Sequence, residues 1–414
     1  MSAVSGGRRR SLVLATVALV VAGVGLTAPQ RAVGVAPCNV SVTRLALKDS
    51  TPFASGARLN RYRASVNYPG GTTYDQTETA LLAMYPAGVS LSLLSSKISE
   101  RTKTGDMVRA QEPQALAAVN GDFFTTETVN GQDLPISRGP MVKDGRILRA
   151  DRTRRRVIGV DTLGHPYGES MGVRGSIQSG PAPSVAVEGV NWGTVHRGGA
   201  TIFTPRWSAA APRPSGVVEW VINGRGLITE TRSLGTNAAK LGAPVSVGTR
   251  VVAFSRDVSP IGEAGVVGDK ARVNLRQITN TGVTLDTAMG RGITLVDNGV
   301  AAPLDCSLYS HSKDARPRTL IGWNSNGAWR TLTVPGREFT ASLFRDGGFG
   351  LANEAAIAKR LRLVQAYELD GGGSTTLYTR NTRGRWARRD LFGVRGGNYE
   401  RTVPNGFAFV APVG

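Results

Sequence analysis

Val364–Thr375 reads Val-Gln-Ala-Tyr-Glu-Leu-Asp-Gly-Gly-Gly-Ser-Thr, a strand-like run that ends in an acid and three glycines. Side chains alternate along a strand, so we expect Glu368 and Asp370 to share one face, with Cα atoms about 6–7 Å apart. Glycines permit a tight turn, in which consecutive amide N–H groups can converge on an anion. Two carboxylates beside an anion site fit acid–base chemistry next to a phosphate or a sugar. A tight turn with an acidic cap is an equally good interpretation of these residues alone.

The segments around this stretch predict strands with a few short helices. Leu351–Leu363 has the apolar spacing of a helix, with Asn353 as its N-cap. Gln114–Ala118 predicts a short helix with Pro113 in its first turn, and Leu81–Tyr85 fits a buried strand or helix. Strands are predicted at Val40–Leu47, Tyr62–Tyr68, Val89–Leu93, Val217–Ile222, Gly248–Phe254, Ile293–Val296, Thr319–Trp323, Trp329–Val334 and Phe407–Val410. This order predicts an α+β protein with mixed, largely antiparallel sheets and a few flanking helices.

The N-terminus has the pattern of an export signal. Arg8–Arg10 precedes an apolar run at Leu12–Val24, and small residues follow near Ala28 and Ala36. A basic region, a short apolar region and small residues in this order are typical of a signal peptide. Arg9–Val13 also resembles a twin-arginine core, and a plain secretory signal fits the same residues. A retained anchor is the alternative.

This pattern divides the chain into a leader and one domain. We expect residues 1–36 to be a signal peptide and residues 37–414 to form the mature domain. Residues 37–118 are its N-terminal part, and residues 119–414 carry the motifs described below. We therefore expect a secreted, extracellular or cell-wall-associated protein with no stable membrane span after processing.

The composition is that of a folded, basic protein. Of 414 residues, 41% are hydrophobic and 19% are charged, which excludes a disordered chain. The formal charge is +20, and the first 36 residues hold four arginines and no acid, so the remainder carries +20 − 4 = +16. Such a charge favours anionic partners. For an exported protein we expect a sugar-phosphate or anionic glycopolymer, not nucleic acid. A GC-rich genome, which favours arginine over lysine, would produce the same charge without any functional reason.

Cysteine and histidine are scarce. Cys38 and Cys306 are the two cysteines and could form a disulfide outside the cytoplasm. The three histidines are His165, His196 and His311. These numbers exclude a thiolate zinc cluster and leave little room for a Ser–His–Asp triad. We therefore predict no metal site and no cofactor, with a divalent cation held by carboxylates as the alternative.

Four polar segments stand beside apolar strands. They are Asn120–Phe124, Arg316–Gly322, Glu368–Thr375 and Arg401–Gly406. Their combination and order resemble the phosphodiester glycosidase family, from about residue 40 to the C-terminus. Two further segments, Gly189–Trp192 and Met289–Gly299, are similar to the longer bacterial form of that family. The resemblance implies a phosphodiester-glycosidase-like domain that hydrolyses a sugar–phosphate diester, such as one of N-acetylglucosamine 1-phosphate.

The resemblance also implies roles for single residues. When the bond between sugar and phosphate breaks, the phosphate leaves with little need of protonation. Stabilisation of its negative charge by arginine therefore matters more than a strong general acid. A carboxylate must then activate water or attack the anomeric carbon. We assign this role to Asp370 first, to Glu368 second and to Asp122 third. The substrate-binding candidates are Asn120, Gly121, Arg138, Arg318, Thr319, Gly371, Gly372, Gly373, Ser374, Arg401 and Asn405.

Other interpretations stay open at this point. Asp122 could cap a turn, and Glu368 could pair with an arginine for structure alone. The three carboxylates could instead hold a hard cation in a phosphodiesterase that cleaves the P–O bond. A third possibility is a non-catalytic protein that binds an anionic wall polysaccharide. The stretch 197–216 and the arginine-rich Arg380–Arg389 match no motif, and could shape an entrance, bind a polyanion or form solvated loops.

Overall fold

The structure is a computed structural model that describes residues 40–67, 75–208, 211–304, 315–335, 347–390 and 400–412. All of these residues belong to one compact unit that runs from Ala36 to Gly414. The predicted signal peptide, both cysteines of the predicted disulfide and His311 lie outside the described residues. Within the described ranges, no helix is long and apolar enough to cross a membrane.

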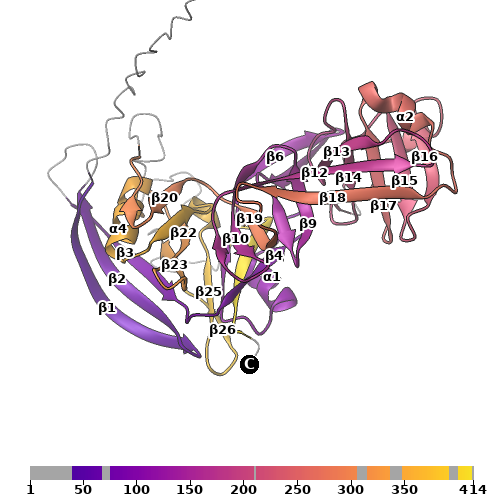
Figure 1. The fold of residues 1–414 in the computed structure, drawn as a ribbon. Coiled ribbons are helices and arrows are strands. Elements are labelled where there is room, and N and C mark those ends of the chain that lie inside the picture. Colours follow the sequence, from indigo (N-terminus) through magenta and orange to yellow (C-terminus); the bar gives the residue numbers. More distant parts are fainter. Residues whose placement is uncertain are drawn as a thin grey trace, which may run out of the picture. The chain divides into compact units, whose positions relative to one another are not determined.

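The Glu-Leu-Asp stretch extends from a strand inside an eight-stranded sheet (Figure 1). The strand order is β1 (Val42–Ala54), β2 (Ala57–Asn67), β3 (Asp75–Met84), β23 (Trp329–Val334), β22 (Arg318–Trp323), β24 (Gln365–Glu368), β20 (Thr294–Asp297) and β21 (Val300–Ala301). Strand β24 pairs antiparallel with β22 on one side and with β20 on the other. Helix α4 (Leu351–Arg360) covers one face, where its Ile357 and Ala358 pack in one core with Leu320. This packing fixes the end of β24, where the candidate acids lie.

A second, five-stranded sheet carries the other two motifs. Its order is β26 (Trp386–Arg388), β25 (Leu377–Arg380), β5 (Ala117–Asn120), β27 (Asn405–Val410) and β4 (Ser90–Ser95). Strand β5 is central and is buried along its whole length. Helix α1 (Thr104–Gln111) packs Met107 and Val108 against this sheet. The C-terminal ends of β5 and β24 are joined, because the amide of Asp370 donates to the carbonyl of Gly121 at 2.9 Å.

The middle of the chain forms the largest sheet and a hairpin. The sheet order is β16 (Ile228–Ser233), β15 (Val218–Asn223), β17 (Thr249–Phe254), β14 (Ala200–Phe203), β13 (Val185–Val190), β9 (Arg146–Asp151), β8 (Met141–Lys143), β19 (Leu285–Gly290), β10 (Arg155–Asp161), β12 (Ser170–Ser179) and β18 (Ala271–Thr279), and β11 (Pro166–Tyr167) pairs with β10. The hairpin is β6 (Phe124–Val129) with β7 (Gln132–Ser137). The remaining short helices are α2 (Ser259–Glu263), η1 (Ala238–Lys240), η2 (Arg256–Val258) and η3 (Gly372–Ser374). Strands β13 and β14 are parallel, and the other pairings in the described ranges are antiparallel.

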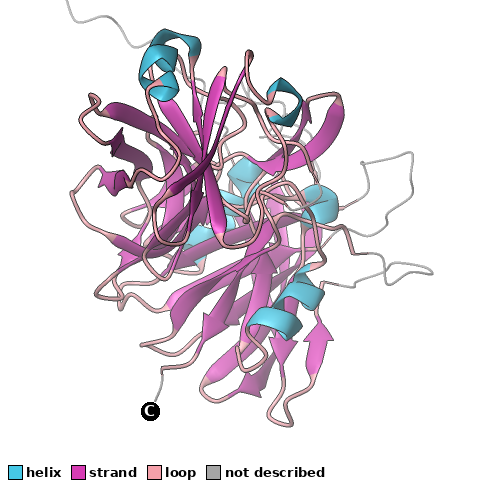
Figure 2. Cartoon of the chain, turned by 90° about the vertical axis from the view of Figure 1, so that its right-hand side faces the viewer, coloured by secondary structure: helices cyan, strands magenta, loops and turns pink. Residues whose placement is uncertain are grey.

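The predicted fold class is confirmed: strands dominate, with a few short helices (Figure 2). Leu81–Tyr85 falls mainly in strand β3, which ends at Met84. The helix predicted at Gln114–Ala118 is wrong, because these alanines lead into β5, which is buried between β25 and β27. Tertiary pairing has overridden the helix propensity of alanine there. Helix α4 has Gly350 at its N-cap, not the predicted Asn353.

Parts of the described stretch within residues 197–216 are built into the core. It contains β14 and the fully buried Trp207, whose indole N–H donates to the Pro212 carbonyl at 2.8 Å. Arg213 is also fully buried and forms two 2.7 Å hydrogen bonds with Glu219. A solvated loop is therefore the wrong interpretation of these parts of the stretch.

Candidate active site

Three carboxylates come together where β5 and β24 end. Asp122 lies two residues after β5, Glu368 closes β24, and Asp370 follows two residues later. Burial is the main cause that raises the pKa of Glu368 and of Asp370; the charge of Asp370 adds to the first shift and that of Asp122 to the second. Asp370 therefore lies within electrostatic reach of both other acids, and the five-stranded sheet supplies the third acid.

Asn120 joins the elements that carry this site. Its side-chain N–H donates to the carbonyl of Asp370 at 2.6 Å. Its side-chain oxygen accepts from the Thr319 hydroxyl and from the Thr376 amide, each at 3.0 Å. Asn120 is fully buried. These contacts use the amide of Asn120 and the hydroxyl of Thr319 to hold β5, β22 and the glycine turn together.

A buried network holds Asp122. One Asp122 carboxylate oxygen accepts from the Ser137 hydroxyl at 2.7 Å and from the Gly139 amide at 2.6 Å. Asn405 accepts from the Asp122 amide at 2.8 Å and donates to Ser137 at 3.1 Å. A Cβ on Gly290 would lie 2.3 Å from the same carboxylate oxygen, so this position has no room for a side chain. Burial raises the pKa of Asp122, and the bonds from Ser137 and Gly139 oppose this effect.

The Gly189–Trp192 segment lies behind Asp122. The guanidinium groups of Arg149 and Arg155 both lie against the Trp192 ring, at 4.0 and 4.7 Å from the ring centre. Arg149 is fully buried and donates to the Asn191 carbonyl at 2.7 Å. The positive charge of Arg149 lowers the pKa of Asp122. This segment therefore acts on the site through Arg149.

Glu368 lies in a tight, arginine-bearing recess. One of its carboxylate oxygens is 3.7 Å from a guanidinium nitrogen of Arg318, and the other accepts from the Ile293 amide at 3.4 Å. A Cβ on Gly292 would lie 2.4 Å from that second oxygen. Arg318 is itself buried and donates to the Phe349 carbonyl at 2.9 Å. Burial raises the pKa of Glu368 to about 7, against the opposing effect of Arg318.

Asp370 lies at the start of the glycine turn and is more accessible than Glu368. Burial raises its pKa to about 6, while a hydrogen bond from Ser374 and the charge of Arg401 lower it. Arg401 also approaches the Ser374 hydroxyl, at 3.5 Å. Gly372 has φ +60°, a left-handed conformation that favours glycine. Asp370 is thus a carboxylate next to a hydroxyl and a guanidinium group.

The turn differs from the expected anion nest. The Gly372 amide donates to the Pro317 carbonyl at 2.8 Å, and the Ser374 and Thr375 amides donate within the turn at 3.2 Å. The Gly371 amide donates toward the Asp370 carboxylate. The Ser374 and Thr375 bonds form a short 3₁₀ turn, and the four N–H groups are engaged with protein acceptors. Anion binding at this place then depends on side chains.

Several residues at the site were missed from sequence. The guanidinium groups of Arg101 and Arg401 lie over the same Phe124 ring, 5.4 and 5.0 Å from its centre. The charge of Arg156 lowers the pKa of Glu368. Glu354, on α4, is fully buried, and burial raises its pKa to about 8 beside the charges of Arg318 and Glu368. No motif or periodicity marks Arg101, Arg156 or Glu354, because each comes from a different part of the chain, whereas Arg401 is among the candidates from sequence.

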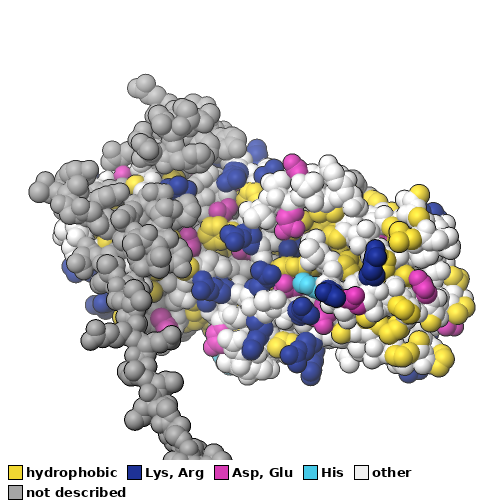
Figure 3. All heavy atoms as spheres, turned by 90° about the horizontal axis from the view of Figure 1, so that it is seen from above, with side chains coloured by type: hydrophobic (Ala, Val, Ile, Leu, Met, Phe, Trp, Pro, Cys, Tyr) yellow, Lys and Arg dark blue, Asp and Glu magenta, His cyan; other side chains and the backbone are white. Residues whose placement is uncertain are grey.

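The other candidates are placed as follows. Gly121 is buried, and a Cβ there would lie 2.2 Å from the Asn405 side-chain oxygen. Arg138 is exposed, and its amide donates to the Phe123 carbonyl at 2.8 Å. Over the described ranges, no three Asp, Glu, His or Cys side chains have the geometry of a metal site. Basic side chains spread over the middle of one face, interspersed with acidic ones (Figure 3).

Fold and site together define a β-rich protein with a buried centre of carboxylates and arginines. Residues 216–410 match the model of the phosphodiester glycosidase family. This match supports a glycosidase-type function. The match does not include Asn120–Phe124, which the structure nevertheless brings to the same site. Among curated proteins, none matches this chain.

Solved structures show the same fold. A Synechocystis protein is 19% identical, with a TM-score of 0.63 over 89% of this chain and 68% of that chain. An exported protein of Burkholderia pseudomallei is 14% identical, with a TM-score of 0.66 over 89% of this chain and 97% of that chain. The catalytic domain of zebrafish N-acetylglucosamine-1-phosphodiester alpha-N-acetylglucosaminidase is 13% identical, with a TM-score of 0.46 over 90% and 88%. The first two likenesses establish the fold alone.

Proposed function

We propose that this protein is an exported glycosidase that hydrolyses the bond between a sugar and phosphate in a sugar-1-phosphate diester, within a cell-wall or extracellular glycopolymer. The observation that carries the proposal is the surroundings of Asp370. It is a carboxylate with a pKa of about 6, so it is largely ionised at neutral pH, and it is hydrogen-bonded to Ser374 beside the cationic Arg401. A nucleophile or base and an anion-binding group thus lie together.

In the proposed reaction, the Asp370 carboxylate takes a proton from a water that attacks the anomeric carbon, or attacks that carbon itself to form a glycosyl ester, which water then hydrolyses at the anomeric carbon to release the sugar and the free carboxylate. The glycosidic C–O bond breaks, and the electron pair leaves with the phosphate monoester. Arg401 stabilises the negative charge on that phosphate, because guanidinium pairs well with phosphate oxygens. A leaving group of this acidity needs little protonation, so no strong general acid is required.

Glu368 is the second carboxylate of the reaction. With a pKa of about 7 it carries a proton on roughly half of the molecules at neutral pH, and can exchange one with water or with a sugar hydroxyl. Arg318 and the Ile293 amide fix its position. Asp122 is proposed to orient water or a sugar hydroxyl from the five-stranded sheet. Its carboxylate is held in place by hydrogen bonds from the Ser137 hydroxyl and from the Gly139 and Phe123 amides.

For Asn120, Thr319 and Asn405 we propose a positioning role instead of direct sugar contact. The polar atoms of their side chains are engaged in the buried bonds that hold Asp122 and Asp370. We propose that the glycines at the site let the backbone pass close to neighbouring atoms; they are Gly121, Gly371 and Gly373. Phosphate is then bound by the side chains of Arg401 and Ser374. Arg138 is exposed and is proposed to meet the distal part of the substrate. No cofactor is proposed.

Export is supported by the leader pattern in residues 1–36 and by the exported protein among the structural neighbours. The two competing functions are a cation-dependent phosphodiesterase and a non-catalytic glycopolymer-binding protein. Both make distinct predictions for the products of a small ester, so one assay separates them.

The test uses the purified protein from residue 37 onward and the methyl phosphodiester of α-N-acetylglucosamine 1-phosphate, with and without EDTA. We expect free sugar in both conditions. Asp370→Asn should lower kcat by about 10²–10⁴-fold, the range for loss of a positioned acid or base, and the surface variant Asp106→Asn should match wild type. Sugar 1-phosphate that disappears with EDTA would establish P–O cleavage instead. Binding of the ester without any product would show that the protein is a non-catalytic glycopolymer-binding protein.

A further inference from the structure

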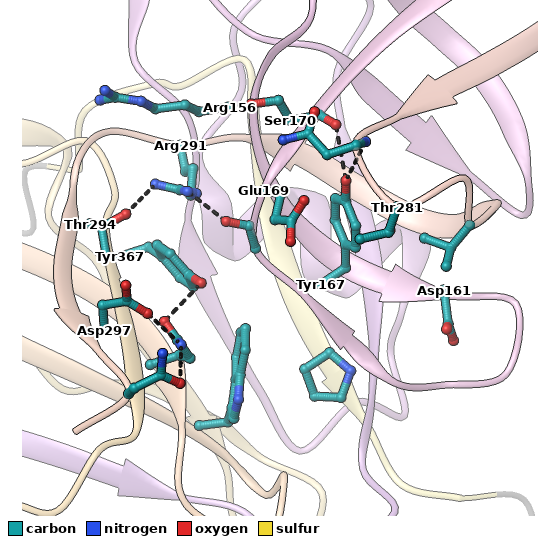
Figure 4. A pocket seen from close by; sticks show the side chains of 17 residues that line it. Arg156, Asp161, Tyr167, Glu169, Ser170, Thr281, Arg291, Thr294, Asp297 and Tyr367 are labelled. Carbon is teal, nitrogen blue, oxygen red and sulfur yellow. Dashed lines mark hydrogen bonds between the residues drawn. The ribbon is translucent and has the colours of Figure 1, made fainter. Parts of the chain in front are cut away.

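A pocket of about 760 Å³ lies apart from the three carboxylates. Its volume is in the range of about 300–1,000 Å³ that small-molecule sites occupy. It is lined by residues of β10, β11, β20, β22, β24 and the segment between β18 and β19. Figure 4 shows Tyr367 and Tyr167 on two sides of this pocket, with Glu169 between them. Nothing in the proposed reaction uses these three residues.

The pocket is separate from the carboxylate site but adjacent to it. Tyr367 and Glu368 are neighbours on β24, so their side chains point to opposite faces of that strand. Arg291 closes the pocket wall, with its guanidinium group 4.0 Å from the centre of the Tyr367 ring. Arg156 lines the pocket, and its charge also reaches Glu368. A chain-like ligand could therefore occupy both places at once.

Acidic side chains outnumber basic ones in the pocket lining, which holds Asp161, Glu169 and Asp297 against Arg156 and Arg291. Arg291 has its three guanidinium nitrogens in hydrogen bonds, including one to the Val157 carbonyl at 3.1 Å and one to the Gly168 carbonyl at 2.5 Å. These bonds engage four of its five N–H groups and hold the side chain in the pocket wall. Glu169 is exposed to the pocket, and Asp297 lines it as well. In a chain of net charge +20, such a pocket is poorly suited to phosphate.

The pocket combines aromatic faces with polar edges. Trp323 and Tyr367 both line it, with ring centres 5.6 Å apart and planes tilted by 49°. Gln365 donates to the Asp297 carboxylate at 2.9 Å, which leaves acceptor positions on Asp297 facing the pocket rim. A pyranose ring has an apolar C–H face and hydroxyl groups around its edge, so it matches this pattern. An uncharged sugar is therefore the ligand class that the chemistry favours.

We infer that this pocket binds an uncharged sugar residue, as a carbohydrate subsite next to the carboxylate centre. The inference rests on the proposed function in one respect: the sugar would belong to the same glycopolymer whose sugar–phosphate bond is cut. The ring stacks on Trp323, and hydroxyl groups donate to Glu169 and Asp297. The phosphate stays at Arg401, on the other side of the Arg291–Tyr367 wall.

The test is calorimetric titration of the protein with three uncharged trisaccharides: maltotriose, cellotriose and triacetylchitotriose. We expect at least one to bind with a dissociation constant of about 1 mM or lower. Glu169→Gln, at an exposed position that should not affect folding, should weaken this binding about tenfold, the factor that corresponds to about 1.4 kcal/mol. Trp323→Ala should weaken it at least as much. Glu263→Gln, an exposed acid on α2 outside the pocket, should bind as wild type does.

Two results would overturn the inference. One is the absence of binding of all three trisaccharides at concentrations about tenfold above that value. The other is binding that Glu169→Gln leaves unchanged, which would place the sugar elsewhere. Since titration needs no turnover, binding without ester hydrolysis would contradict the proposed function alone. Ester hydrolysis without trisaccharide binding would contradict this inference alone.

Discussion

At the scale of single residues, the site depends on carboxyl groups whose pKa values are raised by burial. Asp370 and Glu368 titrate at about 6 and about 7, within the range where enzymes exchange protons at neutral pH. Their neighbours adjust these values: Ser374 and Arg401 lower the pKa of Asp370. The catalytic activity should therefore depend on pH in a way that single substitutions shift predictably.

The acidic limb of the pH profile should report Asp370. Activity requires the ionised carboxylate, so kcat/KM should fall as the pH drops below about 6. Ser374→Ala removes a hydrogen bond that stabilises the ionised form, so it should move this limb to higher pH. The exposed Ser215→Ala is the matched control and should leave the limb in place. A limb that Ser374→Ala does not move would show that another group controls it.

Glu354 should make stability fall with increasing pH. Its pKa in the folded protein is about 8, above its ordinary value of 4.5, so the folded state binds this proton more tightly. This contribution to stability is fully present below about pH 4.5 and is lost as the pH rises through about 8. Glu354→Gln does not titrate, so its Tm should decline less than that of wild type between pH 5 and 9. Parallel declines in a thermal shift assay would contradict the burial of this group.

At the scale of elements, the site depends on close approaches of strand ends. The connection Gly290–Arg291–Gly292, between β19 and β20, brings one glycine against Asp122 and the other against Glu368. Its arginine forms the wall of the neighbouring pocket. A side chain at either glycine would meet a carboxylate, so the absence of a Cβ is what lets the acids lie against this connection.

Gly292→Ala should therefore displace Glu368. The added Cβ would lie 2.4 Å from a carboxylate oxygen and 2.9 Å from the Phe123 ring, and the flexible end of Glu368 must move away. We expect kcat to fall at least tenfold while Tm changes by only a few degrees. Gly235→Ala, at an exposed turn with its nearest atom 3.9 Å away, is the control and should be silent. Wild-type kcat in Gly292→Ala would argue against a role for the Glu368 position.

Local sequence predicted the elements well, and the contacts between them poorly. The sequence predicts the hairpin of Thr319–Trp323 and Trp329–Val334, because Asn324–Gly327 is a turn between apolar runs. Strand β5 could not be predicted from the sequence, because its alanines favour a helix unless other strands bury them. Arg101, which shares the Phe124 ring with Arg401, has no local signal at all. Such partners are set by the tertiary fold, which periodicity does not encode.

At the scale of the whole molecule, large sheets hold the described chain together, and a few charged pairs are buried within them. The pair of Arg213 and Glu219 is fully buried and bidentate. Arg232 also approaches Glu219, at 3.6 Å. In the sequence, Arg213 belongs to the stretch 197–216, which matches no motif. Its partner Glu219 lies on β15, next to β17, and only the structure shows that the two side chains pair. Most other basic residues remain spread over the surface, as the sequence indicated.

Breaking this pair should destabilise the protein without touching the chemistry. Arg213→Ala leaves a buried carboxylate with a weaker partner, which costs about 3–5 kcal/mol of the free energy of unfolding. Urea unfolding should show this loss, while kcat per folded molecule on the small ester should be unchanged. The exposed Arg225→Ala is the control and should unfold as wild type does. A loss below about 1 kcal/mol in Arg213→Ala would contradict the buried pair.

The central claim is that water attacks the anomeric carbon and not phosphorus. The most direct test is hydrolysis of the methyl phosphodiester of α-N-acetylglucosamine 1-phosphate in ¹⁸O-labelled water, with mass spectrometry of the products. The account predicts ¹⁸O in the released N-acetylglucosamine and none in methyl phosphate, with the signal greatly reduced in Asp370→Asn. Because free sugar exchanges its anomeric oxygen with water, the decisive product is methyl phosphate. Incorporation of ¹⁸O into methyl phosphate, or release of sugar 1-phosphate, would contradict the account.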